Sequence, residues 1–383
     1  MRTLLVAGGS GGHLIPALTL ADHLRRQGPC LLLTSTRPIE TVLLRSFDKL
    51  RMSGVPQDER SRLECATVDL KRFTPLWRWL SPRYVVRQIK AVWRVRSILR
   101  EFRPDVVVGF GGYLSASGVF IAQKSGIPTI LHEQNVLPGK ANRWLSSLTD
   151  TVAVSFPQTK DFLSGRAHVE VTGNPIRPHL KQVSPQQARA FFCFDDRRPI
   201  VVIMGGSQGS QAINWLALRM WESASAQERQ RVQVVHLAGP SEIALIEERY
   251  RAFGMEARVY GFLREIEMCY AAADLVISRA GATSIAEMMA LQVPAILIPY
   301  PHAGAHQLAN AQWMESVGGA VVCREAGLTP EALWKEIAGF LKWPGRLAQM
   351  RAALRGFQFG VTQVPSGASA VERLSALVER TAV

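Results

Sequence analysis

The chain has 383 residues, of which 47% are hydrophobic and 20% charged, and its formal net charge is +14. The length suggests at least two domains, and the apolar content excludes an intrinsically disordered chain. No apolar run approaches the roughly 18 residues of a membrane span. No signal peptide precedes the first strand, so we expect a cytoplasmic protein. The positive charge indicates an anionic partner: nucleic acid, acidic lipid or a phosphorylated substrate.

Strand-like apolar segments alternate with helix-length amphipathic segments along the chain. In the first half these segments are residues 3–7, 30–34, 66–70, 105–110, 128–133, 151–156 and 169–173. In the second half they are residues 199–204, 232–238, 257–262, 274–278, 294–300 and 319–323. This alternation is typical of parallel sheets with helices on both faces. We therefore expect an α/β protein with two Rossmann-like, doubly wound domains, and a ligand-binding cleft between them.

The segment "TGNPIRPHLKQVSPQQ" contains three prolines and a Gly-Asn pair, which are typical of an interdomain connection. We place an N-terminal domain at residues 1–175 and a C-terminal domain at residues 176–360. Residues 361–383 include an amphipathic helix, and the sequence leaves open whether this helix packs back on the first domain. Five scattered cysteines include no C-x-x-C pair, which favours buried thiols over a disulfide framework or a zinc site.

Two similar glycine turns, "GGSGGH" at residues 8–13 and "GGSQGS" at residues 205–210, each follow the first strand of a domain. Backbone N–H groups in such turns, and the helix start behind them, suit phosphate. Neither turn has the lysine of a P-loop, and the first fails the G-x-G-x-x-G dinucleotide pattern at Leu14. NAD binding is therefore disfavoured. The alternative is that the glycines only permit tight turns.

His13 ends the first glycine turn, where we expect the first turn of a helix. A helix start disfavours the imidazolium, so this histidine would stay largely neutral, as a general base requires. The alternative is a solvent-exposed histidine near the helix cap.

The stretch from Ser278 to Ala311 carries the nucleotide signals of the second half. A helix begins near Gly281, and Glu287 follows within its first two turns, where a carboxylate suits the paired hydroxyls of a ribose. Ser284 and Glu287 also fit a capping box, which would make the glutamate structural. His306, Gln307 and Asn310 begin the next helix, where polar side chains suit sugar hydroxyls or act as surface caps.

Residues 71–103 contain ten Lys or Arg residues and one acidic residue, Glu101, and so supply +9 of the net charge. Aromatic residues are interspersed, as in segments that bind anionic bilayers. The predicted membrane-binding residues are Trp77, Arg78, Trp79, Arg83, Arg87, Lys90, Trp93 and Arg94. The alternatives are aromatic core residues beside a solvated basic face, or nucleic-acid binding, for which no fold signature is present.

Seven motifs in order resemble the MurG family of peptidoglycan glycosyltransferases: "GGSGGH", "GFGGYLSASG", "HEQN", "TGNPIR", "GGSQGS", "SRAGATSIAE" and "PYPHAGAHQLANA". The resemblance runs from residue 3 to about residue 320. It implies the GT-B fold and inverting transfer of N-acetylglucosamine from UDP-N-acetylglucosamine (UDP-GlcNAc) to undecaprenyl-diphosphate-linked N-acetylmuramoyl pentapeptide, the step from lipid I to lipid II. It also implies a peripheral position on the cytoplasmic face of the cell membrane. Other cell-wall synthesis or division proteins are conceivable partners.

The resemblance also implies roles for individual residues. Glu287 would bind the ribose, and the uracil would lie at Phe262 and Leu263. The diphosphate and donor sugar would be surrounded by Arg279, Gly281, Ala282, Thr283, Ser284 and Ser207. Hydroxyls of the N-acetylglucosamine would be bound by Gln307 and Asn135, with Arg177 nearby. The acceptor would face Tyr113, Ser10, Gly11 and Gly12, with His13 as the base.

The expected reaction is a single displacement at the anomeric carbon, with inversion. No D-x-D motif is present, so we expect no metal and no other cofactor; helix starts and Arg279 would stabilise the diphosphate instead. Glu133 remains an alternative base. Two alternative functions are a related GT-B glycosyltransferase with another lipid or small-molecule acceptor, and a UDP-GlcNAc epimerase.

Overall fold

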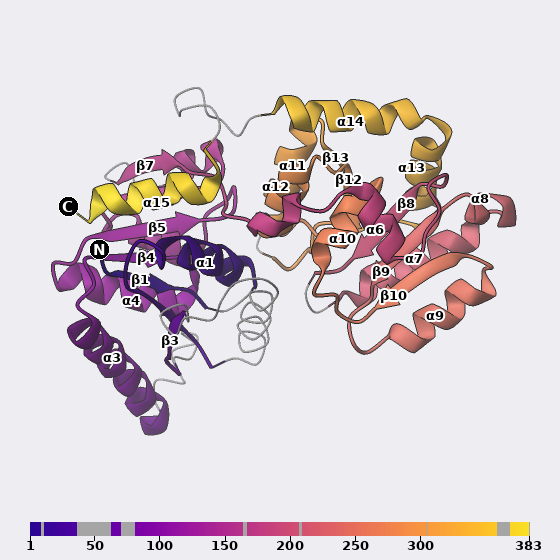
Figure 1. The fold of residues 1–383 in the computed structure, drawn as a ribbon. Coiled ribbons are helices and arrows are strands. Elements are labelled where there is room, and N and C mark those ends of the chain that lie inside the picture. Colours follow the sequence, from indigo (N-terminus) through magenta and orange to yellow (C-terminus); the bar gives the residue numbers. More distant parts are fainter. Residues whose placement is uncertain are drawn as a thin grey trace. The chain divides into compact units, whose positions relative to one another are not determined.

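The computed structural model describes residues 1–8, 11–36, 63–69, 81–163, 167–206, 209–303, 305–357 and 368–382. The chain forms two compact α/β units (Figure 1). Unit 1 comprises Met1–Arg177 and Phe359–Val383, and unit 2 comprises Pro178–Gln358. The chain therefore passes from unit 1 to unit 2 within the proline-containing segment 172–187.

Unit 1 is built on a seven-stranded parallel sheet with the order β3-β2-β1-β4-β5-β6-β7. The strands are β1 (Thr3–Val6), β2 (Cys30–Thr34), β3 (Glu64–Thr67), β4 (Val106–Gly109), β5 (Thr129–Glu133), β6 (Thr151–Val154) and β7 (His168–Val171). Strand order reverses between β1 and β4, which lie side by side. In doubly wound sheets, ligands bind at the carboxyl ends of the strands at such a switch point.

The helices of unit 1 include one from the far end of the chain. They are α1 (Gly11–Leu24), α3 (Pro82–Phe102), α4 (Gly112–Lys124), α5 (Lys140–Leu145), α15 (Ala370–Thr381) and the 3₁₀ helix η3 (Pro157–Phe162). A capping box between Ser369 and Glu372 starts α15. Its apolar face, including Leu374 and Leu377, packs into the core that Leu14 and Leu18 of α1 share. The C-terminal helix thus completes unit 1 (Figure 1).

Unit 2 repeats this topology with a six-stranded parallel sheet in the order β10-β9-β8-β11-β12-β13. The strands are β8 (Ile200–Met204), β9 (Gln233–Leu237), β10 (Glu256–Tyr260), β11 (Leu275–Ser278), β12 (Ala295–Leu297) and β13 (Ala320–Val322). Here the order reverses between β8 and β11. The two doubly wound parallel sheets expected from the sequence are therefore confirmed.

Helices cover both faces of this second sheet (Figure 1). They are η4 (Pro178–Lys181), α6 (Pro185–Phe191), α7 (Gln211–Ser223), α8 (Ala226–Gln230), α9 (Ile243–Ala252), α10 (Ile266–Ala272), α11 (Ala282–Leu291), α12 (His306–Ser316), α13 (Pro330–Lys342) and α14 (Pro344–Gly356). The largest side chains of their shared core are Trp221, Tyr250 and Phe340, all fully buried.

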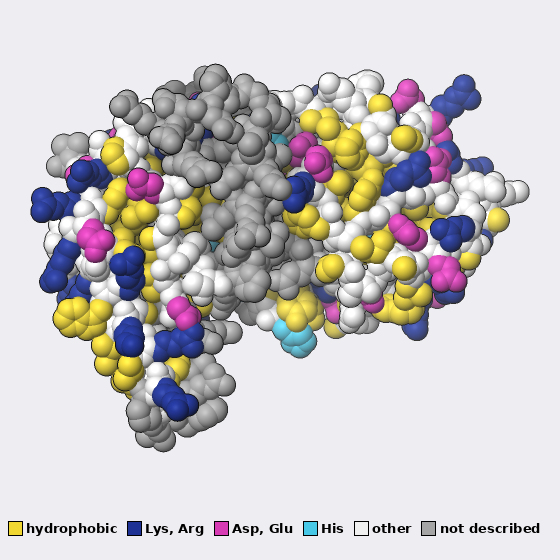
Figure 2. Space-filling model, turned by 60° about the horizontal axis from the view of Figure 1, so that its bottom comes forward, with side chains coloured by type: hydrophobic (Ala, Val, Ile, Leu, Met, Phe, Trp, Pro, Cys, Tyr) yellow, Lys and Arg dark blue, Asp and Glu magenta, His cyan; other side chains and the backbone are white. Residues whose placement is uncertain are grey.

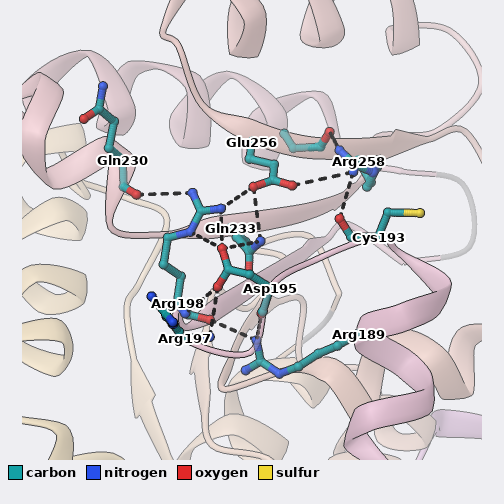
Figure 3. A network of polar contacts seen from close by, with 10 residues as sticks. Arg189, Cys193, Asp195, Arg197, Arg198, Gln230, Gln233, Glu256 and Arg258 are labelled. Carbon is teal, nitrogen blue, oxygen red and sulfur yellow. Dashed lines mark hydrogen bonds and ion pairs between the residues drawn. The ribbon is translucent and has the colours of Figure 1, made fainter.

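A polar network connects the segment before β8 with the amino ends of β9 and β10 (Figure 3). Arg198 pairs with Asp195 and with Glu256 of β10, and its hydrogen bonds lower the pKa of the Asp195 carboxyl to about 2. Arg189 of α6 donates to the Asp195 carbonyl at 2.8 Å and to Asp274, just before β11, at 2.9 Å. The network therefore connects the starts of β8, β10 and β11.

All five cysteines are free thiols. Cys30 and Cys269 are buried, and burial raises the pKa of the Cys30 thiol to about 12. The expectation of buried thiols is wrong for Cys65 and Cys193, which are exposed on the edge strand β3 and after α6. Within the described ranges, no three His, Cys, Asp or Glu side chains are grouped closely enough to hold a metal ion. No helix in those ranges has the length and apolar character needed to cross a membrane.

Candidate active site

Two helix starts meet at the switch point of unit 1. Helix α1 follows β1, and α4 follows β4, with Gly111 as the N-cap of α4. Gly111 and Gly112 have φ values of +99° and +79°, which L side chains rarely adopt. A Cβ at Gly111 would lie 3.0 Å from His13 Cε1, and one at Gly112 would lie 2.7 Å from the Gly8 carbonyl oxygen. These glycines therefore let α4 approach the imidazole of His13.

His13 lies in the first turn of α1, as the sequence predicted, and it is half-buried. Its Nδ1 lies 2.8 Å from Oε1 of Gln134, the first residue after β5. Gln134 is buried, and sequence reasoning missed it. The only signal was its place at the carboxyl end of a central strand, where ligand-binding residues of parallel sheets lie.

The carboxylate of Glu133, the alternative base, accepts four hydrogen bonds from the residues that follow it in the chain. Its Oε1 accepts hydrogen bonds from the backbone and the side-chain amide of Asn135, at 2.9 and 3.0 Å. Its Oε2 accepts from the Gly139 backbone at 3.0 Å and from Asn142 Nδ2 at 2.9 Å. A carboxylate has about four acceptor positions, so these four donors fill them. Both carboxylate oxygens of Glu133 are thus engaged within the protein.

Among the other residues expected in this unit, Gly11, Gly12 and Tyr113 are expected at the acceptor, and Asn135 and Arg177 at the donor sugar. Gly11 and Gly12 begin α1, Tyr113 lies half-buried in the first turn of α4, and Asn135 follows β5. Arg177 is the last residue before the chain passes from unit 1 to unit 2. Ser10 lies outside the described residues. The structure therefore places His13, Tyr113 and Asn135 after three neighbouring strands, β1, β4 and β5.

The start of α11 is the corresponding place in unit 2. The helix begins at Ala282 after Gly281, whose N-cap position has no side-chain hydrogen bond. Ser284 therefore lies inside the helix, and the capping-box interpretation is wrong. Glu287 is only 3% exposed and instead accepts a hydrogen bond from the Tyr270 hydroxyl at 3.0 Å. Thr283 and Ser284 lie in the first turn, where backbone N–H groups have no partner within the helix.

Arg279 connects the starts of α7 and α11. Its guanidinium donates to the hydroxyl of Ser210, the N-cap of α7, at 2.9 Å and to the Ile298 carbonyl at 3.1 Å. It also pairs with Glu325 and lies over the ring of Tyr300. Arg279 thus holds a positive charge beside the second glycine turn. Ser207, in that turn, lies outside the described residues.

The remaining residues expected at the donor surround the same end of the sheet. Phe262, just after β10, is 45% exposed, and Leu263 is half-buried. Gln307, in the first turn of α12, accepts from the Tyr300 backbone through Oε1 at 2.9 Å. Asn310 is buried and donates to the Ala280 carbonyl at 3.2 Å, so it supports the chain just before α11.

Helix α3 exposes apolar and basic side chains together. Val86, Ile89 and Trp93 are exposed, Trp93 by 62%, and the exposed basic residues among them are Arg83, Arg87, Lys90 and Arg94. Figure 2 shows yellow and dark blue side chains next to one another at the lower left, where α3 lies. The alternative in which the aromatic residues belong to the core is therefore wrong for Trp93. Trp77, Arg78 and Trp79 lie outside the described residues.

Two doubly wound α/β units in one chain, each with helix starts at the switch point of its sheet, define the GT-B class. Residues 3–154 match the N-terminal domain of glycosyltransferase family 28, and residues 200–364 match its C-terminal domain. The chain belongs to the family of UDP-N-acetylglucosamine--N-acetylmuramyl-(pentapeptide) pyrophosphoryl-undecaprenol N-acetylglucosamine transferases. The family expected from the sequence is confirmed.

The similarity to members of this family extends over the whole chain. The enzyme of Hahella chejuensis is 35% identical over 92% of this chain and 92% of its own length. That of Acidothermus cellulolyticus is 36% identical over 100% of this chain and 98% of its own. The crystal structure of Acinetobacter baumannii MurG, at 25% identity, superposes with a TM-score of 0.72 and covers 99% of this chain and 100% of that one. A UDP-GlcNAc 2-epimerase from Neisseria meningitidis superposes with a TM-score of 0.68 at 14% identity, which shows only that the two proteins share a fold.

Proposed function

We propose that this protein transfers N-acetylglucosamine from UDP-GlcNAc to undecaprenyl-diphosphate-linked N-acetylmuramoyl pentapeptide, converting lipid I to lipid II in peptidoglycan synthesis. The observation that carries this proposal is the end-to-end match, at about 35% identity, to enzymes named for that reaction. Both domains of the family are present, at residues 3–154 and 200–364.

The donor binds to unit 2 at the carboxyl ends of β8 and β11. The starts of α7 and α11 direct backbone N–H groups and the positive helix ends toward the diphosphate. Glu287 accepts hydrogen bonds from the ribose hydroxyls, and Phe262 and Leu263 border the uracil. The diphosphate and sugar contact Arg279, Gly281, Ala282, Thr283, Ser284, Ser207 and Gln307. The exposure of Phe262 and the hydrogen bond by which Tyr270 orients the Glu287 carboxylate support this arrangement.

The acceptor binds to unit 1 at the carboxyl ends of β1, β4 and β5. His13 takes the proton of the muramyl hydroxyl as that oxygen attacks the anomeric carbon of the donor. The bond from the anomeric carbon to the diphosphate breaks in the same displacement, and UDP leaves with the bonding electron pair. The configuration inverts, from an α-linked donor to a β-1,4-linked product. Tyr113, Asn135, Arg177 and the start of α1 position the two substrates.

A transfer assay with labelled UDP-GlcNAc tests the proposed reaction. We expect label to move to a muramyl-diphospho-lipid analogue in β linkage, and equally well with EDTA present. Transfer of label to diacylglycerol or to a small-molecule acceptor would indicate a different transferase. Formation of UDP-N-acetylmannosamine would indicate an epimerase. Label transferred only to another acceptor, or epimerised donor with no transfer, would contradict the proposal.

Helix α3 binds the protein to the cytoplasmic face of an anionic membrane, where the lipid-linked acceptor lies. A basic residue near such a surface contributes about 1 kcal/mol. Replacing Arg83, Arg87, Lys90 and Arg94 by Gln should therefore reduce partitioning to anionic vesicles by about 10²–10³-fold. A sedimentation assay measures this loss.

The matched control removes the same charge from exposed positions of unit 2: Arg219, Arg231, Arg251 and Lys335, each replaced by Gln. Partitioning should then stay close to that of the unchanged protein, because α3 retains its basic residues. If both quadruple variants bind vesicles equally, α3 is not the membrane-binding element.

A further inference from the structure

The amide of Gln134 has one possible orientation. Its Nε2 lies 2.9 Å from the Phe110 carbonyl oxygen and 3.0 Å from that of His132. Carbonyl oxygens only accept hydrogen bonds, so the NH₂ group must point toward them. The opposite orientation would place Oε1 against two carbonyl oxygens in a buried position, with Gln134 only 1% exposed. Oε1 of Gln134 therefore faces Nδ1 of His13, at 2.8 Å.

The orientation of Gln134 decides the tautomer of His13. Since an amide oxygen only accepts, Nδ1 of His13 must carry the proton in this hydrogen bond. A neutral imidazole has a single ring proton, so Nε2 of His13 then has a free lone pair. In water the neutral histidine side chain prefers the opposite tautomer, protonated at Nε2. Gln134 thus opposes the intrinsic preference of the ring.

His132 gives an independent check on this assignment. The Gln134 amide has two N–H bonds for three nearby acceptors, so one N–H is shared. Nδ1 of His132 lies 2.9 Å from Gln134 Nε2 and accepts from it, and Nε2 of His132 lies 3.0 Å from the Gly173 carbonyl oxygen and must donate to it. Both contacts are satisfied by one ring proton. Burial lowers the pKa of His132 to about 4, which is consistent with a neutral ring. The hydrogen bonds that connect Gly173, His132, Gln134 and His13 therefore fit one consistent assignment of donors and acceptors.

We infer that Gln134 is a positioning residue that holds His13 protonated at Nδ1, so that Nε2 is the atom that receives the proton of the acceptor hydroxyl. The final step rests on the proposed function, in which His13 is the base. The tautomer itself does not depend on that function. Gly111 contributes by leaving room for the ring at 3.0 Å from where a Cβ would be. A base held in the wrong tautomer loses up to about 10⁴-fold in turnover.

The tautomer can be measured directly by ¹⁵N NMR on protein labelled in its histidine rings. The His13 signals are assigned as those missing from His13→Ala. We expect a protonated Nδ1 and an unprotonated Nε2 in the unchanged protein, and loss of this preference in Gln134→Met. Gln88→Met, the same change of a buried glutamine on α3, should leave the His13 signals unchanged. His13 protonated at Nε2 in the unchanged protein would overturn the inference, whether or not Gln134→Met folds.

Kinetics test the consequence of the tautomer. Gln134→Met should lower kcat by about 10–10²-fold, because a freed ring spends most of its time in the other tautomer or orientation, while the KM for UDP-GlcNAc stays unchanged. An unchanged kcat in Gln134→Met would overturn the positioning role.

The His13→Ala variant separates the two possible failures. Normal turnover in His13→Ala contradicts the proposed base, whereas Nε2 protonation in the unchanged protein overturns the role of Gln134 alone. A lowered kcat in Gln134→Met with an unaltered tautomer would also count against Gln134, since the loss would then have another cause.

Discussion

Tyr270 and Glu287 form a buried pair in unit 2, joined by a hydrogen bond of 3.0 Å. A hydrogen bond to a carboxylate is worth about 1.5–3 kcal/mol. Glu287→Ala should therefore raise the Kd for UDP by roughly 10–10²-fold, because the ribose loses its acceptor. Tyr270→Phe leaves the carboxylate in place but less well oriented, and should raise Kd by about 3–10-fold.

Calorimetric titration with UDP measures both effects. Tyr250→Phe is the matched control, because it removes a buried hydroxyl that contacts His236 and Trp221 in the core of unit 2. It should lower stability without changing the Kd for UDP. Unaltered UDP binding in Glu287→Ala would remove this residue from the donor site.

At the scale of single residues, the sequence indicated which residue types stand in the local patterns, but it did not indicate which residues they contact. His13 and Glu287 stand in local patterns that indicate their chemistry. Gln134 acquires its importance only because β5 brings it to α1, 121 positions away in the chain. The capping-box interpretation failed because the helix begins at Ala282, so that Ser284 is two residues inside. A cap depends on the residue that starts the helix, which the spacing alone does not determine.

Helix α4 and its two glycine ends allow a controlled comparison. Gly111 at its start and Gly126 after its end both have positive φ, +99° and +74°. An alanine at either position is strained, at a cost of about 1 kcal/mol. Only at Gly111 would the added Cβ meet His13; at Gly126 nothing lies within 4 Å. We predict that Gly111→Ala lowers kcat by about 10-fold or more, since a displaced base loses alignment.

Gly126→Ala should show a similar loss of stability in urea unfolding and normal turnover. Equal kcat values in the two variants would mean that the close approach of α4 to His13 has no part in the reaction.

Strands were the elements that the sequence predicted best. Each expected segment overlaps one of the strands, because buried parallel strands are nearly continuous apolar runs. Strands β7 and β10 begin one residue before their expected segments, and the largest difference is at β3, which begins at Glu64 rather than at residue 66. It is an edge strand with no fully buried side chain, so its sequence carries little of that apolar signal.

At the scale of the whole molecule, α15 connects the end of the chain to its beginning. Its amphipathic pattern indicated a buried face but could not identify the partner, which is the α1 layer of unit 1. Leu374 is fully buried there. Leu374→Ala should lower the free energy of unfolding of unit 1 by about 2–4 kcal/mol, through lost burial and the cavity left behind.

Urea unfolding should show this loss in the transition of unit 1 only. Leu245→Ala, at an exposed position of α9 in unit 2, should change stability by less than about 0.5 kcal/mol. A Leu374→Ala protein as stable as the unchanged one would mean that α15 does not pack on α1 in solution.

The central claim is that His13 deprotonates the acceptor and takes no part in binding the donor. Steady-state transfer by His13→Ala tests it most directly, with lipid-linked muramyl pentapeptide saturating and UDP-GlcNAc varied. We predict that kcat falls by about 10²–10⁴-fold, as for a lost general base, with the KM for UDP-GlcNAc nearly unchanged. An unchanged kcat, or a loss confined to the KM for UDP-GlcNAc, would contradict the account.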